Sequence, residues 1–270
     1  MLGAGFLHAL WNALLKSSAG DAMLDTVLIV GGGCAVCLPL LPFIPLPAAA
    51  AWPFVFASMV VHFAYYIALA GAYRRGDLSF AYPLMRGVAP LIVTLLGIAF
   101  LSERLRPETL IGIAMISAGI ITIAWFASGR HTLAAAGWAL ANAAIIATYT
   151  LIDGAGARAA GNPWSYAVWL TCLDALPFIA WVLWTRGRTA VAYVVPRWRR
   201  GVIGGAASIG AYGIVLWAMT LAPIAIVAAL REVSVVFAAL MGTPFLKESF
   251  GWRRLAGAVG VAAGVAMLRL

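Results

Sequence analysis

Two arginines stand inside long apolar stretches of this sequence. Arg86 lies in "YPLMRGVAPLIV" (82–93), and Arg231 lies in "ALREVSVVFAAL" (229–240). Each is about nine residues into a stretch long enough to cross a bilayer, so it should lie about 13 Å deep, near the midplane. A charge at that depth is costly unless it faces water or a partner. Two guanidinium groups there can bind a carboxylate or a phosphate, because their planar fork matches both.

The sequence leaves open whether these arginines bind a substrate anion or complete an internal ion pair. The acids best placed for such a pair are those expected to be embedded, namely Glu232, Asp174 and Asp153. The two interpretations can coexist if a substrate competes with the internal acid. A carboxylate desolvated in lipid favours its protonated form, so the same acids are candidates for carrying a coupling proton, with Glu232 preferred.

Polar and aromatic side chains also gather on single faces of otherwise apolar helices. The spacing i, i+3, i+4 puts three of them on one face of the first expected helix and three on one face of the third. These six residues are His8, Trp11, Asn12, His62, Tyr65 and Tyr66. In the second half the comparable candidates are Tyr149, considered with Asp153, and Tyr212, considered with Trp217. Such faces either line a substrate cavity or join helices by hydrogen bonds.

Two further acids, Glu103 and Glu248, end apolar stretches in loop-like contexts. We expect each to cap a helix at the membrane interface or to pair with the nearby Arg104 or Lys247. A role in binding substrate is less expected, because both lie far from the middle of their stretches.

The composition requires a lipid environment for these elements. The chain has 270 residues, of which 64% are hydrophobic and 10% charged, whereas soluble domains are about 45–50% apolar and about 25% charged. The net charge is +9, but the basic residues cluster in short segments between apolar runs, as in loops at lipid headgroups. This pattern argues against nucleic-acid binding.

The apolar stretches predict an all-α membrane protein with ten spans and short loops. The expected spans are about 2–16, 24–44, 52–73, 78–101, 107–126, 132–153, 163–185, 201–221, 223–246 and 252–269. The first of them lacks a basic start and a small-residue cleavage site, so we interpret it as a span and not as a signal peptide.

The two halves of the sequence resemble each other. With a shift of 145 residues, 86–119 lies over 231–264 without gaps. Arg86 then falls on Arg231 and Glu103 on Glu248, and three glycines, Gly97, Gly112 and Gly119, fall on Gly242, Gly257 and Gly264. A rare arginine and a rare glutamate, 17 residues apart in both copies, indicate an internal duplication.

Because five is an odd number, the two copies of a five-span unit must enter the membrane from opposite sides. We therefore expect two inverted repeats, 1–127 and 128–270, related by a two-fold axis in the membrane plane. This architecture is typical of secondary transporters, with the substrate site near the midplane between the halves.

The chain resembles the EamA-type, ten-helix members of the drug/metabolite transporter superfamily over nearly its whole length. The resemblance rests on "HALWNALLK" (8–16), "GDLSFAYPLMRGVAPLIV" (76–93), "LSERL" (101–105), "ALREVSVVFAAL" (229–240) and "LKESF…RRLAGAVGVAAGV" (246–265). It implies export or exchange of a small metabolite by alternating access in the cytoplasmic membrane of a bacterium, often coupled to a proton or ion gradient. The two central arginines favour an anionic or zwitterionic substrate.

Other functions are expected less. No HExxH, GxSxG or phosphate-binding glycine loop is present, so we expect no enzyme activity, no cofactor and no metal. Cys34 and Cys37 form a CxxC without a second ligand pair and are expected to pack in the apolar core. Efflux of hydrophobic or cationic drugs remains an alternative, with Trp11, Tyr65, Tyr66 and Glu232 as its aromatic cage and acid. A membrane sensor or an intramembrane enzyme is the alternative of another class.

Two arguments give opposite orientations of the chain in the membrane. Ten spans put both termini on one side, and the resemblance implies that this side is the cytoplasm. In that orientation the inner loops and the C-terminus hold four basic residues, Arg104, Arg106, Arg158 and Arg269, and the outer loops hold twelve. The excess of positive charge on cytoplasmic loops seen in membrane proteins favours the opposite orientation.

Overall fold

The fold is a bundle of helices. The computed structural model describes residues 1–16, 21–75, 78–126, 132–234 and 252–268, and every regular element within these ranges is helical. The α-helices are α1 (Leu2–Lys16), α2 (Ala22–Cys37), α3 (Trp52–Arg75), α4 (Leu78–Leu101), α5 (Pro107–Trp125), α6 (Leu133–Ala159), α7 (Pro163–Arg186), α8 (Arg188–Val194), α9 (Trp198–Leu221), α10 (Ile224–Arg231) and α12 (Trp252–Met267). Short 3-10 turns lie at Leu38–Leu40, Ala49–Ala51 and Val195–Arg197.

Seven helical stretches in the described residues are long and apolar enough to cross a membrane. They lie in α2, α3, α4, α5, α6, α7 and the combined stretch of α8 and α9. Shorter apolar helices lie at Leu2–Trp11 and Ala256–Met267, and the ninth expected span, 223–246, continues beyond the described residues after 234. The chain is therefore an integral membrane protein with several spans.

Short polar motifs start the helices where the sequence changes from loop to apolar run. The side chain of Asn162 accepts from the backbone N–H of Trp164 at 2.9 Å, and Pro163 is the first residue of α7. The Thr132 hydroxyl accepts from the N–H of Ala135 at 3.0 Å at the start of α6. Such caps satisfy backbone donors that a helix leaves free at its N-terminus.

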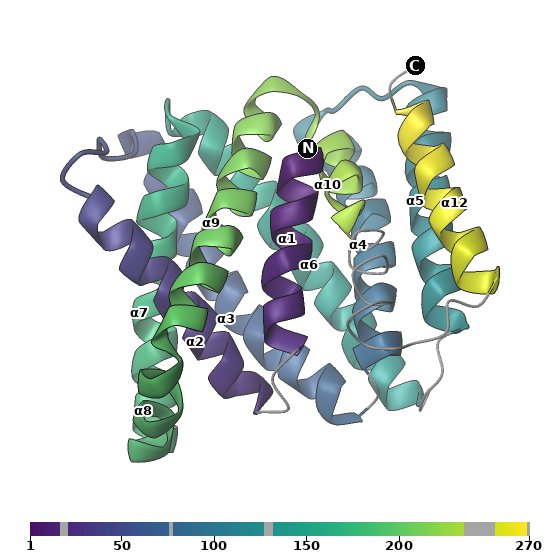
Figure 1. Ribbon diagram of the computed structural model, residues 1–270. Coiled ribbons are helices and arrows are strands. Elements are labelled where there is room, and N and C mark those ends of the chain that lie inside the picture. Colours follow the sequence, from purple (N-terminus) through teal and green to yellow (C-terminus); the bar gives the residue numbers. More distant parts are fainter. Residues whose placement is uncertain (17–20, 76–77, 127–131, 235–251, 269–270) are drawn as a thin grey trace.

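One helix was absent from the sequence prediction. The segment expected to be a loop between the seventh and eighth spans contains α8, which joins α9 in one helical stretch, Arg188–Leu221, of 34 residues. At 1.5 Å per residue this stretch measures about 50 Å, whereas the hydrocarbon core is about 30 Å thick. Part of it must therefore lie outside the core, and Figure 1 shows α8 at the edge of the bundle opposite both termini.

Helices from the two halves of the chain pack directly against each other. In Figure 1, α12 lies beside α5 and α9 lies beside α2, and both chain ends stand at the same edge of the bundle. Glycines allow the backbones to touch. A Cβ atom at Gly32 would overlap the backbone of Gly201, and a Cβ at Gly112 would come within 2.9 Å of the Gly264 carbonyl oxygen. Small residues thus permit the close packing of α2 on α9 and of α5 on α12.

Candidate functional site

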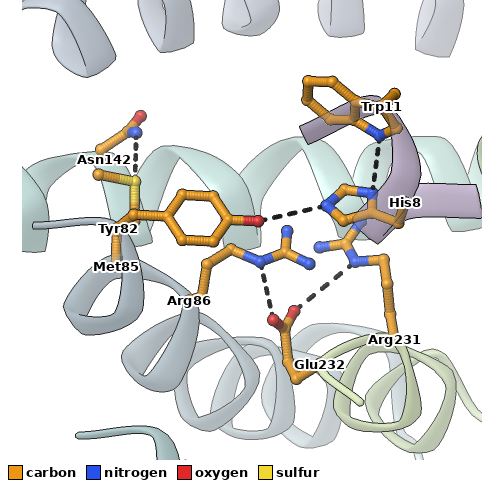
Figure 2. Close-up of polar contacts among 8 residues, drawn as sticks. All are labelled: His8, Trp11, Tyr82, Met85, Arg86, Asn142, Arg231 and Glu232. Atoms are coloured by element: carbon orange, nitrogen blue, oxygen red, sulfur yellow. Dashed lines mark hydrogen bonds and ion pairs between the residues drawn. The ribbon is translucent and has the colours of Figure 1, made fainter. Parts of the chain in front are cut away.

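Helices α4 and α10 bring the two arginines together around one acid. Figure 2 shows Arg86 from α4 and Arg231 from the end of α10 on either side of the Glu232 carboxylate. Arg86 Nε lies 2.7 Å from Glu232 Oε2, and Arg231 Nε lies 3.7 Å from Glu232 Oε1. Arg86, Arg231 and Glu232 are 4%, 7% and 0% exposed. Of the three acids proposed as partners, the structure selects Glu232.

The charges of the triad formed by Arg86, Arg231 and Glu232 do not cancel. Two guanidinium groups meet one carboxylate, which leaves one positive charge in excess if Glu232 is ionised. The 2.7 Å contact is an ion pair without directed hydrogen-bond geometry, and Arg86 Nη2 has no hydrogen-bond acceptor among the described residues. A buried donor of this kind costs free energy until an acceptor reaches it. The arrangement can therefore accept a further anionic group.

The position of Glu232 explains how it reaches both arginines. Residues adjacent in a helix point about 100° apart, so a regular helix by itself does not direct Glu232 toward Arg231. Glu232 is the C-cap of α10, with φ −69° and ψ −12°, and its N–H donates to the Ala229 carbonyl at 3.1 Å. The chain leaves α10 in a tight turn there, which directs the carboxylate across to α4.

Two prolines flank Arg86 within α4. Pro83 and Pro90 both lie inside the helix. Because Pro90 has no N–H, it cannot donate to the carbonyl of Arg86, which is four residues earlier. Asn142, buried on α6, donates to Met85 Sδ at 3.1 Å and connects α4 to its neighbour (Figure 2). The segment around Arg86 thus lacks a backbone hydrogen bond within α4, and the contact with Asn142 attaches it to α6.

Helix α1 contributes His8 and Trp11 beside the triad. Trp11 Nε1 donates to His8 Nδ1 at 3.3 Å, and the Tyr82 hydroxyl lies 3.5 Å from His8 Nε2. Figure 2 shows His8 and Tyr82 above the two guanidinium groups. The side chain of Asn12, the third expected member of this face, lies outside the described part of the structure.

A second polar cluster surrounds Asp153, which is 1% exposed. The hydroxyl of Tyr166 donates to Asp153 Oδ1 at 3.0 Å, and the hydroxyl of Tyr212 donates to Oδ2 at 2.7 Å. Asp153 is therefore held by tyrosines from α7 and α9, and no arginine among the described side chains pairs with it. Trp217, considered with Tyr212 in the sequence, is 48% exposed and does not belong to this cluster.

The remaining candidates gather in an aromatic group on α3, α6 and α7. His62 stacks on Tyr149 with ring centroids 4.4 Å apart, and its Nδ1 lies 3.0 Å from the Ser58 hydroxyl. Tyr65 contacts both Tyr149 and Tyr66 edge to face. The Tyr66 hydroxyl donates to Asp174 Oδ2 at 3.2 Å.

Asp153 and Asp174 thus have tyrosine partners, which supports a structural contribution. We expect Asp153→Ala to lower the free energy of unfolding by about 2–4 kcal/mol, because two phenolic hydroxyls lose a charged acceptor. Chemical denaturation in detergent measures this change. Asp153→Asn keeps one acceptor oxygen and should recover about half of the loss. Equal losses for the two variants would contradict this account.

The structure corrects the expected partners of Glu103. Its carboxylate accepts from the backbone N–H of Ile224 at 2.6 Å and of Ala225 at 3.2 Å, at the start of α10. The basic partner is Arg158 of α6, 3.6 Å away, whereas Arg104 is exposed. The cap was expected, but it acts on a helix more than 100 residues away in sequence. Glu248 and Lys247 lie outside the described residues.

Sequence reasoning missed three residues of these clusters. Tyr82 precedes Arg86 by four residues and so shares its helix face, which is a signal that the spacing contained. Tyr166 and Arg158 have no such signal, because their partners Asp153 and Glu103 are reached only through tertiary packing. Cys34 and Cys37 are buried free thiols in the apolar core, as expected.

Comparison with known families identifies the class of protein. The fold is a helical membrane bundle with charged side chains embedded in it. The family model of the EamA-like transporter family matches residues 133–270, and the chain belongs to this family. It is therefore a membrane transporter of small molecules, in a family of transporters and not of enzymes.

Solved structures agree on the fold. Twenty-eight chains of known structure match. One of them, a crystal structure of a protein, is 20% identical and superposes with a TM-score of 0.73, covering 99% of this chain and 97% of that chain. A comparison with curated protein sequences found no match.

Proposed function

We propose that this protein is a secondary transporter that moves a small anionic or zwitterionic metabolite across the membrane by alternating access. In this proposal ten spans form two inverted halves, 1–127 and 128–270. The halves sit in the cytoplasmic membrane of a bacterium. The partners are the substrate, the bilayer and a coupling proton or ion, and nucleic acid is not among them.

Reciprocal contacts between α5 and α12 support the inverted halves. Cβ atoms at Gly112 and Gly264 would each meet the other residue's carbonyl oxygen, at 2.9 and 2.6 Å, and the same holds for Gly119 and Gly257, at 2.6 and 2.7 Å. A shift of 145 residues converts the first pair into the second with the partners exchanged. A two-fold axis between the helices produces this exchange.

The pairing of other helices is consistent with the same axis. Helix α3 packs on α6, and their counterparts in the other half, α9 and α1, also pack together. Alternating access then corresponds to a change in how the halves meet around the centrally placed arginines.

The observation that carries the substrate class is the uncompensated positive charge of the triad. Arg86 and Arg231 share one acid, and Arg86 Nη2 lacks an acceptor among the described residues. A substrate carboxylate or phosphate can bind the two guanidinium groups and displace Glu232. Glu232, once separated from both arginines in a dry site, favours its protonated form, which links substrate binding to proton uptake.

The test is thermal stability of the purified protein with chemically distinct ligands. The panel contains inorganic phosphate, succinate, alanine and tetraphenylphosphonium. We expect an anionic or zwitterionic member to raise Tm by about 2–4 °C or more near saturation. Arg86→Gln and Arg231→Gln should abolish this rise, because each removes half of the guanidinium pair. Arg104→Gln, at an exposed arginine after α4, is the matched control and should keep it.

The aromatic group supports a second candidate, the efflux of hydrophobic cations. Tyr65, Tyr66 and Tyr149 lie together beside Asp174, which is the acid of this group in place of Glu232. Faces of aromatic rings and an acid attract organic cations. Stabilisation by tetraphenylphosphonium alone, retained in both arginine variants, would favour this function and overturn the anion proposal.

The proposal follows the family expectation that both termini face the cytoplasm. A reporter fused after residue 270, active only in the cytoplasm or only outside it, tests this orientation. Activity outside would favour the distribution of basic residues in the loops instead.

A further inference from the structure

The carboxylate of Glu103 joins the end of α4 to the start of α10. Its side chain is only 5% exposed, although it lies in the loop two residues after α4 ends at Leu101. Oε1 and Oε2 accept from the N–H groups of Ile224 and Ala225, the first two residues of α10. These N–H groups have no acceptor within their own helix, and the positive end of the helix dipole favours a carboxylate there.

The conformation of the turn after α4 places the Glu103 carboxylate. Ser102 has φ +53°, in the left-handed region that residues other than glycine rarely adopt. The backbone N–H of Glu103 donates back to the Gly97 carbonyl at 3.1 Å. A Cβ atom at Gly97 would lie 3.1 Å from Glu103 Oε2, so the absence of a side chain leaves room for the carboxylate.

Arg158 of α6 holds the other side of the carboxylate. Its Nη2 lies 3.6 Å from Glu103 Oε1. Its Nε donates to the Met219 carbonyl at 2.8 Å, and Nη2 donates to the Ala222 carbonyl at 2.9 Å, at the end of α9. Glu103 therefore connects α4 to α6, α9 and α10 at one place, which is the edge of the bundle where both termini stand (Figure 1).

Helix α10 transmits this connection to the charged triad. It has eight residues, from Ile224 to Arg231, and so spans about 10 Å between the two ends. Glu103 fixes one end, and Arg231 and Glu232 stand at the other. The same α4 that leads into Glu103 carries Arg86. The distance between Arg86 and its partners thus depends on how α4 and α10 are joined.

We infer that Glu103, with Arg158, is a positioning latch that closes the terminus-side edge over the arginine site. The latch is formed in this structure and must release when the site opens to that side. This inference rests on the proposed alternating-access function. It predicts that loss of the carboxylate frees the start of α10 and gives solvent access to the region of Glu232.

Two readouts test the latch on the full chain in lipid nanodiscs. The first is hydrogen–deuterium exchange at the amides of Ile224 and Ala225, which should rise at least about tenfold in Glu103→Ala. Glu103→Gln keeps one acceptor and should fall between. The second is reaction of N-ethylmaleimide with a thiol introduced by Ser234→Cys, at a position 1% exposed beyond Glu232. Its rate should also rise about tenfold in Glu103→Ala.

Internal and matched controls separate a latch from general loosening. The native thiols of Cys34, Cys37 and Cys172 are buried between α2 and α7 and should stay unreactive. Glu108→Ala, at an exposed acid in the first turn of α5, should change neither readout. If Glu103→Ala does not fold, Arg158→Gln carries the test, with the same direction and a smaller effect because the backbone bonds of Glu103 remain.

The outcomes are decisive for the latch and separable from the proposed substrate site. Faster amide exchange with an unreactive introduced thiol would make Glu103 a helix cap only and overturn the latch. Increased reactivity of the native thiols as well would indicate general unfolding and also overturn it. If both latch readouts behave as expected but no anion stabilises the wild-type protein, the closure stands and the anion site fails.

Discussion

Glu232→Gln is expected to lower the free energy of unfolding by about 3–5 kcal/mol, the largest loss of any single charge replacement proposed for this protein. The carboxylate lies between Arg86 and Arg231, and all three side chains are buried. Glutamine has nearly the same shape, so packing is preserved while two guanidinium charges lose their counter-charge. Removing one partner of a buried ion pair is strongly destabilising because the other charge stays buried. Denaturation of the detergent-solubilised protein measures the loss.

A double substitution separates the charge effect from other causes. Arg86→Met in the Glu232→Gln background removes one of the stranded charges, so the double variant should be more stable than Glu232→Gln alone. Glu108→Gln, at an exposed acid in the first turn of α5, should change stability by no more than about 1 kcal/mol. A loss for Glu232→Gln as small as that of Glu108→Gln would mean that the triad holds an uncharged acid.

Gly32→Ala is expected to lower the free energy of unfolding by about 1–3 kcal/mol or more. The added Cβ would overlap the backbone carbonyl of Gly201 in α9, and a backbone atom cannot turn aside as a flexible side chain can. Helices α2 and α9 would have to separate, which opens gaps along their whole contact. The readout is again denaturation in detergent.

The matched control uses a glycine without neighbours. A Cβ atom at Gly137, in α6, meets nothing within 4 Å, so Gly137→Ala should be neutral or stabilise the protein by up to about 1 kcal/mol through better helix propensity. Similar losses at Gly32 and Gly137 would refute a packing effect specific to α2 and α9. The contrast also tests whether the close approach of these helices persists in the membrane.

Much of the local structure could be predicted because it depends on short segments. The helices in the described residues follow the expected spans closely, for example Leu78–Leu101 for 78–101. A run of apolar residues in lipid must satisfy its backbone hydrogen bonds internally, so it has little choice except a helix. The exception is α8. Its segment lies between basic residues and was expected to be a loop, but it forms a helix.

The residues of the candidate site could be predicted from the sequence, but the ion pairs and hydrogen bonds between them could not. Arg86, Arg231 and Glu232 stand out because charges are rare in apolar stretches, and a shift of 145 residues places Arg86 on Arg231. Which acid completes them depends on the turn that ends α10, since that turn directs Glu232 toward α4. The candidate acids Asp153 and Asp174 instead accept from tyrosines on other helices.

The sequence by itself determined the membrane class, the helical elements and the residues whose charge demands an explanation. These properties follow from composition and from spacing along one helix, and both are local. Only the tertiary structure decided that Glu232 lies between two arginines and that Glu103 caps α10 beside Arg158. The contacts of Glu232 with Arg86 and of Glu103 with Ile224 join residues more than 100 positions apart. The packing of many apolar side chains, each with little specificity alone, brings these residues together.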